Sequence, residues 1–250
     1  MSRLLFGFGD VWNGIKDAAG AVRDGLTGAA DSIWKGLTWL VHRAFGIIEW
    51  FGSILGIRWK KKLWVKVLIL QDDTNKPIAS VGALDDVVDR AKKVFKDEAN
   101  VRLIPPGGGS IVTIYPQPAP EYVLEVPCDA GAFGQIYTKV GRWFRRRCVG
   151  TAAGFFRYGA PATIFVVKDV QGGKRGCFPG VLTDYGYIDP EALSGSDGSL
   201  LTLAHELGHA CDLRHRSNGS LMEEGVGPRH PRLNRRQIAT LRSSPRVTYL

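Results

Sequence analysis

The chain has 250 residues, which is enough for one large domain or for one domain with an appendage. Its hydrophobic content of 44% and charged content of 23% are ordinary for a globular protein, whereas its net charge of +9 is not. The spacing of the four cysteines, at 128, 148, 177 and 211, excludes a zinc finger and a dense disulfide scaffold. They fit either a reducing cytoplasm or one or two disulfide bonds formed after export.

Basic residues gather in three clusters. The clusters are Arg58, Lys60, Lys61, Lys62 and Lys66; Arg142, Arg145, Arg146 and Arg147; and the arginine-rich stretch 229–246. Each cluster is interpreted first as a solvated face. If the clusters instead bound phosphate groups, they would indicate a protein that associates with nucleic acid. No basic motif with interleaved aromatic residues supports that function, so we do not expect a nucleic-acid partner.

Residues 1–60 have a repeating pattern of their own. Aspartates recur every seven residues from Asp10 to Asp31, and apolar residues recur at the same interval from Trp12 to Ile54. This is an amphipathic helical pattern. The glycines of this segment each cost about 1 kcal/mol inside a helix, so its apolar face needs a surface that covers it. The N-terminus carries no standard secretory signal.

Residues 33–57 are long and apolar enough to suggest a membrane span, but Arg43 and Glu49 lie inside them at a cost of about 3 kcal/mol each. We therefore predict a segment that lies in the interface of an anionic membrane, with residues 1–66 as the contact. The protein would then be peripherally membrane-associated, or exported by a leaderless route. The alternative is that the segment packs on its own domain or on a partner protein.

Residues 61–250 are predicted to form one α+β domain. Strands are expected at 62–71, 101–104, 111–115, 122–126, 163–167 and 185–188, and helices at 84–99, over most of 130–157 and at 233–241. Strand, helix and strand between residues 62 and 104 form a crossover unit, which predicts a partly parallel sheet. A further helix should carry His205, with Ser196 or Ser199 as its N-cap.

The stretch His205-Glu206-Leu207-Gly208-His209 contains the motif that indicates chemistry. On a helix, His205 and His209 lie one turn apart on the same face, so both imidazoles reach one ion while Glu206 points at the water beside it. A catalytic zinc ion needs three protein ligands and an open fourth position. His215 is the expected third ligand, and it requires the helix to stop near Asp212 and the chain to double back. Glu223 or Glu224 is the alternative third ligand.

With the third histidine and Met222 included, this stretch resembles the metzincin clan of zinc endopeptidases, and residues 217–222 are most similar to the matrixin type. The resemblance implies a twisted mixed sheet, a zinc-binding helix, a C-terminal helix and an antiparallel strand near the site. In that clan the position of Asp212 is usually Gly, which permits a left-handed turn. Asp tolerates this conformation at a cost of roughly 1 kcal/mol. Met222 matches the methionine that lies beneath the zinc in the clan.

These patterns predict a zinc metalloendopeptidase that acts on protein or peptide substrates. His205, His209 and His215 would bind Zn²⁺, and Glu206 would take a proton from the zinc-bound water as that water attacks the peptide carbonyl. A second function remains open, in which the protein is membrane-active or a scaffold and the zinc domain is structural or inactive.

Overall fold

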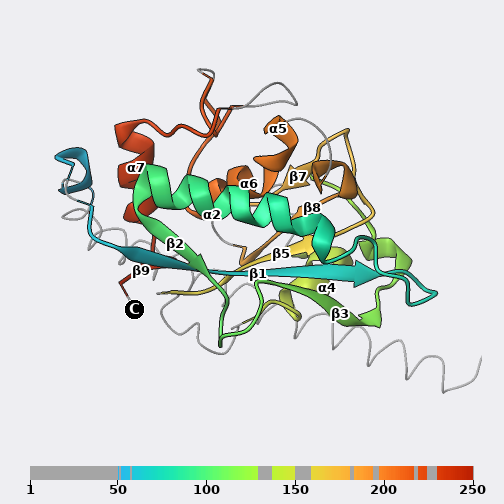
Figure 1. Cartoon of the computed structure of the whole chain (residues 1–250). Helices are drawn as coiled ribbons and strands as arrows, with labels where there is room; N and C mark the ends of the chain where they lie inside the picture. Colours follow the sequence, from blue (N-terminus) through green and yellow to red (C-terminus); the bar gives the residue numbers. More distant parts are fainter. Residues whose placement is uncertain are drawn as a thin grey trace, which may run out of the picture.

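The computed structural model describes residues 50, 52–56, 58–128, 137–149, 159–180, 183–193, 197–216, 219–223 and 230–249. The heptad pattern of residues 10–49 lies outside them, so the predicted amphipathic helix is not tested. In the part of the chain that is described, no helix is long and apolar enough to cross a membrane. The described residues form an α/β fold around one mixed sheet (Figure 1).

The long strand β1 (Lys61–Gln71) is the axis of the sheet. The other strands of this sheet are β2 (Val101–Ile104), β3 (Val112–Pro118), β5 (Ala162–Val166), β7 (Gly176–Cys177), β8 (Tyr185–Ile188) and β9 (Val247–Thr248). β1 pairs in parallel with β2, β3 and β5, and β5 pairs in parallel with β8. Strands β7 and β9 are antiparallel to their neighbours, β8 and β1. The mixed sheet and the parallel crossover from β1 to β2 are therefore confirmed.

Side chains alternate across this sheet and supply two separate cores. From β1, Leu63, Val65, Val67 and Ile69 face one core, whereas Leu68 and Leu70 face the other. The first core is covered by α2 (Asp85–Ala99), α6 (Thr202–Ala210) and α7 (Arg235–Arg242). The second is covered by α4 (Lys139–Arg145) and by the small parallel pair of β4 (Glu125–Val126) and β6 (Asp169–Val170). Figure 1 shows α2 and α6 on one side of β1 and α4 on the other.

Two predicted elements differ from the structure. Residues 122–126 do not form one strand, because a 3-10 turn η2 (Glu121–Val123) precedes the two-residue β4. Val123 and Leu124 are both buried, and consecutive residues of a strand would point to opposite faces. Of the helix predicted over 130–157, the structure describes 137–149, with α4 inside that range.

The arginine cluster in and just after α4 is only partly a solvated face. Arg146 is exposed, as predicted. The Arg147 guanidinium instead stacks 4.0 Å from the centre of the Trp143 ring, and its Nε donates a 2.8 Å hydrogen bond to the Tyr115 hydroxyl. Arg147 therefore contributes to the packing of α4 on the sheet, through a cation–π contact as well as a hydrogen bond.

Helix α6 begins without the serine cap that the sequence predicted. Its N-cap residue is Leu201, which makes no side-chain capping bond, because the short helix α5 (Asp197–Leu200) leads almost directly into it. Ser199 lies within α5, where its hydroxyl accepts a hydrogen bond from Arg175. Ser196 lies outside the described residues. Leu201 and Leu203 are buried as expected, and they fix α6 against the sheet.

Candidate metal centre

Helix α6 carries His205, Glu206 and His209, of which the first two are buried and His209 is half-buried. His205 is 2% exposed and Glu206 is 4% exposed. His205 and His209 are separated by one helical turn, so both rings project from the same face. This arrangement follows from the local spacing alone, and it is the part of the site that the sequence predicts most directly.

The turn after α6 brings the chain back toward these rings. Asp212 has φ of 70°, the left-handed conformation that the sequence predicted for this position. The amide of Asp212 donates to the His209 carbonyl, and the amide of Leu213 donates to the Gly208 carbonyl, both at 3.0 Å. These two bonds are those of a Schellman motif, the common helix ending with a left-handed residue after the cap. The chain is thereby reversed within three residues of His215.

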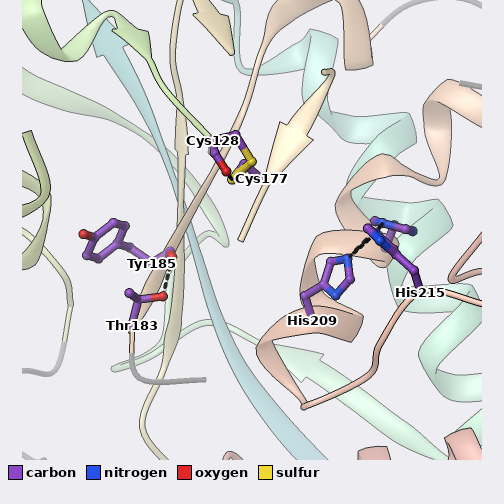
Figure 2. Close-up of a disulfide and its surroundings, with 7 residues drawn as sticks. Cys128, Cys177, Thr183, Tyr185, His209 and His215 are labelled. Atoms are coloured by element: carbon purple, nitrogen blue, oxygen red, sulfur yellow. Dashed lines mark hydrogen bonds between the residues drawn. A yellow bond between two sulfur atoms is a disulfide. The ribbon is translucent and has the colours of Figure 1, made fainter. Parts of the chain in front are cut away.

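His215 joins the other two histidines, so the structure brings all three predicted ligands together. The Nε2 atoms are 3.1 Å apart for His205 and His209, 3.0 Å for His209 and His215, and 3.3 Å for His205 and His215. Figure 2 shows the rings of His209 and His215 close together. A tetrahedral zinc ion with bonds of about 2.0–2.1 Å would hold its ligand nitrogens about 3.3 Å apart. The triangle of nitrogens thus fits an ion of that size and geometry. Among the described residues this is the group of histidine, cysteine and acidic side chains that could hold a metal ion.

Backbone carbonyls orient two of the three rings. His205 Nδ1 lies 2.8 Å from the Leu221 carbonyl, and His209 Nδ1 lies 2.8 Å from the Leu213 carbonyl. A carbonyl only accepts, so each Nδ1 carries the proton, and a neutral ring then turns a bare Nε2 lone pair toward the centre. Lone pairs that converge at about 3 Å repel one another unless a cation lies between them, and outer hydrogen bonds of this kind are typical of metal-binding histidines.

Comparison with known proteins adds no family to these observations. No family model matches the chain, and no curated protein matches it. The donor set of three imidazoles suits zinc and several other divalent transition metals. The geometry therefore establishes a site that could hold a metal ion, built from His205, His209 and His215.

Of the two alternative ligands, only Glu223 lies in the part of the chain that the structure describes. Glu223 is outside the three-histidine cluster, and Glu224 is outside the described residues. Cys211, next to the turn, is a free and fully buried thiol. Burial raises the pKa of that thiol to about 12, so it remains protonated and is a poor metal ligand.

Met222 packs under α6 at its last turn. It is fully buried, and a Cβ atom added to Gly208 would lie 2.5 Å from its sulfur, which is too close for any side chain. The glycine therefore allows the methionine to approach the helix backbone beside His209. The carbonyl of Met222 accepts a hydrogen bond from the amide of Arg216 at 2.9 Å, which ties this loop to the residue after His215.

The backbone of strand β7 packs against the Glu206 side chain, a contact that the sequence did not predict. A Cβ atom added to Gly176 would lie 2.9 Å from both Cγ and Oε1 of Glu206, and 3.0 Å from Cγ2 of Thr202. β7 also runs antiparallel to β8 beside the site, a role that the resemblance left open between the runs 172–180 and 185–188. The one signal in the sequence is a glycine between Arg175 and Cys177, and its meaning depends on contacts that are distant in the chain.

The cysteine pairing that the sequence left open is now assigned. Cys128 and Cys177 form a disulfide (Figure 2). Cys148 and Cys211 are buried and form no disulfide. Cys177 is the second residue of β7, so the disulfide joins the strand beside Glu206 to the segment that follows β4.

Proposed function

We propose that the chain is a zinc-dependent endopeptidase of the metzincin type. One observation carries the proposal: three Nε2 atoms converge at the spacing of a tetrahedral zinc site, on and just after a helix that also presents a buried glutamate. The left-handed residue at Asp212 and the buried Met222 support the resemblance at the two positions that follow the helix.

In this proposal His205, His209 and His215 hold the metal, and Leu221 and Leu213 keep the first two rings in orientation through their carbonyls. Zinc held by three neutral ligands supplies Lewis acidity, which polarises a peptide carbonyl and lowers the pKa of a water toward ~7. Glu206 takes the proton of the attacking water and returns it to the leaving amine. Its burial between α6 and β7 keeps the carboxylate in a fixed place for both transfers.

The test combines metal analysis with hydrolysis of a quenched fluorescent peptide library. Glu206→Gln should retain one zinc per chain and lose at least ~10²-fold in kcat, because it removes the general base and no metal ligand. His215→Ala should lose zinc under the same dialysis. Activity near wild type in Glu206→Gln would overturn the proposal. It would mean that another group activates the water. A wild type without hydrolysis would favour the second function, in which the zinc domain of a membrane-active or scaffold protein is structural.

We also propose that the N-terminal segment holds this enzyme at an anionic membrane surface, with residues 1–66 as the contact. Two described side chains of that range support it: Leu55 is 78% exposed and Trp59 is 65% exposed. Large apolar side chains beside basic residues such as Lys60 suit a lipid interface, since the apolar groups enter the membrane and the ammonium groups meet lipid phosphate.

Co-sedimentation with phosphatidylglycerol vesicles tests the membrane contact. The full chain should sediment, whereas a chain that begins at residue 50 should bind more weakly. Leu55→Ser with Trp59→Ser should weaken binding of the full chain about 10-fold or more, because each apolar side chain contributes roughly 1.5–3 kcal/mol when buried. The matched control is Val81→Ser with Ile114→Ser, at two residues that are 39% and 40% exposed outside the 1–66 segment. A full chain that stays in the supernatant would point to a protein contact instead.

A further inference from the structure

The tripeptide Arg175-Gly176-Cys177 lies directly against the glutamate of the proposed site. The backbone at Gly176 is so close to Glu206 that an added Cβ would be 2.9 Å from two atoms of its side chain. The same Cβ would also meet Cγ2 of Thr202, one helical turn before Glu206. Because Thr202 is β-branched and buried, its side chain has little freedom to yield. The place of the Glu206 carboxylate is therefore set by the position of the β7 backbone.

Strand β7 is too short to hold that position by sheet pairing alone. It has two residues, and among the described strands it pairs with β8 alone, through Gly176 with Ile188 and Cys177 with Tyr187. A two-residue strand at the edge of a sheet has few ladder hydrogen bonds, and such segments open readily. Further contacts are needed to keep Gly176 against Glu206.

Those contacts come from the residues on either side of Gly176. Before it, the Arg175 guanidinium donates a hydrogen bond to the Ser199 hydroxyl, which ties the strand to α5. After it, Cys177 is bonded to Cys128, which ties the strand to the segment that follows β4. β4 is in turn paired with β6 on the opposite side of the sheet from α6. Gly176 is thus held between two attachments to different elements.

We propose that the Cys128–Cys177 disulfide and Gly176 together position Glu206 for catalysis. The disulfide prevents β7 from moving away, and the glycine lets the strand come close enough to define where the carboxylate lies. This inference rests on the proposed peptidase function, and it assigns to the cysteines a positioning role in turnover. Two of the three proposed ligands, His205 and His209, are oriented by carbonyls outside β7, those of Leu221 and Leu213, so zinc binding should not depend on β7.

Two variants of the full chain test the inference, each with a matched control. Cys128→Ser with Cys177→Ser removes the disulfide. Its control is Cys148→Ser, because that change affects a buried cysteine of the second core that forms no disulfide. Gly176→Ala keeps the disulfide and displaces Glu206. Its control is Gly82→Ala, where an added Cβ meets nothing within 4 Å.

We expect both test variants to keep one zinc per chain and a similar KM, and to lose about 10- to 100-fold in kcat, the scale that a displacement near 1 Å can cause. Hydrogen exchange, followed by mass spectrometry of peptides that cover residues 169–189, should be faster in β7 of the cysteine variant and unchanged in the controls. If the disulfide were only structural, its loss would lower the folded fraction, and so zinc content and activity would fall together instead of kcat alone.

The outcomes separate the two proposals. If the wild type hydrolyses peptides and Glu206→Gln does not, then unchanged kcat in both test variants overturns the positioning role alone. Unchanged hydrogen exchange in β7 of the cysteine variant overturns it as well. Loss of zinc in step with activity would assign the disulfide to the metal site and overturn it too. A wild type without hydrolysis overturns the proposed function and this inference with it.

Discussion

Asp212 shows how one residue can decide whether a metal centre assembles. The His205–His209 pair needs only a helix, but His215 reaches the same point because the chain turns through a left-handed residue. In the left-handed conformation the Cβ atom of Asp is crowded by the backbone, which costs roughly 1–2 kcal/mol, whereas Gly has no Cβ and no such cost. The Schellman hydrogen bonds around Asp212 and the burial of Leu213 offset that cost.

At position 212 a glycine variant should therefore be more stable than an alanine variant, the reverse of the usual order in a helix. Both Asp212→Gly and Asp212→Ala lose the carboxylate, but only glycine adopts φ of 70° without steric cost, so the glycine variant should be more stable by about 1 kcal/mol. At Asp86, an exposed position in α2, alanine should instead be more stable by about 1 kcal/mol. Urea unfolding of the four variants measures both differences. The same order at the two positions would contradict the prediction.

The sequence predicted those parts of the site that are set by local spacing. Within eighteen residues the sequence shows two histidines one helical turn apart, a helix end at Asp212 and a following methionine. The carbonyls of Leu213 and Leu221 were not predicted, because any residue type supplies a carbonyl and only the fold determines which one meets a ring. Gly176 was missed for a similar reason, since a glycine in a turn-rich segment has many ordinary explanations.

At the scale of elements, the buried guanidinium of Arg242 joins α7 to the start of the domain. Arg242 is fully buried, and its guanidinium donates hydrogen bonds to the Ala99 carbonyl at 2.6 Å, the Trp59 carbonyl at 2.9 Å and the Ser53 hydroxyl at 3.0 Å. Lys61 adds a 2.8 Å bond to the carbonyl of Arg242. These bonds join α7 to α2 and to the segment before β1. Hydrogen bonds that involve a charged group stabilise the fold more than neutral ones do.

Arg242→Met should lower the free energy of unfolding by about 2–4 kcal/mol, because methionine keeps much of the volume but leaves buried acceptors without their donor. Arg236→Met on the exposed side of the same helix should change it by less than about 0.5 kcal/mol. Chemical denaturation with zinc held constant measures the difference. Equal effects at the two arginines would mean that the buried guanidinium contributes no net stability.

Strands with strong apolar character were predictable, and very short ones were not. The expected strands at 62–71, 163–167 and 185–188 agree with β1, β5 and β8 within a residue at each end. Strands β4, β6, β7 and β9 have two residues each, so no periodic pattern can develop within them. They exist because a neighbouring strand offers hydrogen-bond partners, which is a property of the fold and not of the segment.

At the scale of the whole molecule, Ser53, Arg58 and Trp59 contact the domain that follows them. Ser53 and Trp59 accept hydrogen bonds from Arg242, while Arg58 donates to the Glu98 carbonyl and its own carbonyl accepts from Asn100. The sequence placed the start of the peptidase domain at residue 61. These contacts indicate that a shortened chain should begin at residue 50 if it is to keep all the partners of Arg242.

A chain that begins at residue 61 should accordingly be less stable than one that begins at residue 50, by about 2 kcal/mol or more, since it loses two acceptors of a buried guanidinium. Thermal unfolding of the two shortened chains, both loaded with zinc, measures this difference. Equal midpoints would show that residues 50–60 are dispensable for the domain. In that case the lower boundary would remain at residue 61.

Strand β1 is synthesised long before some of the strands that pair with it. It pairs with β2 and β3 along one edge and with β5 and β9 along the other, and its Lys62 meets Thr248 from the far end of the domain. During synthesis β1 and β2 can associate early, but the partner of Lys62 emerges from the ribosome much later. At about 5–20 residues per second the wait is on the order of 10–40 s. For that time an apolar strand stays without its full set of neighbours, so the nascent chain should depend on chaperones that cover β1 until translation has passed residue 248.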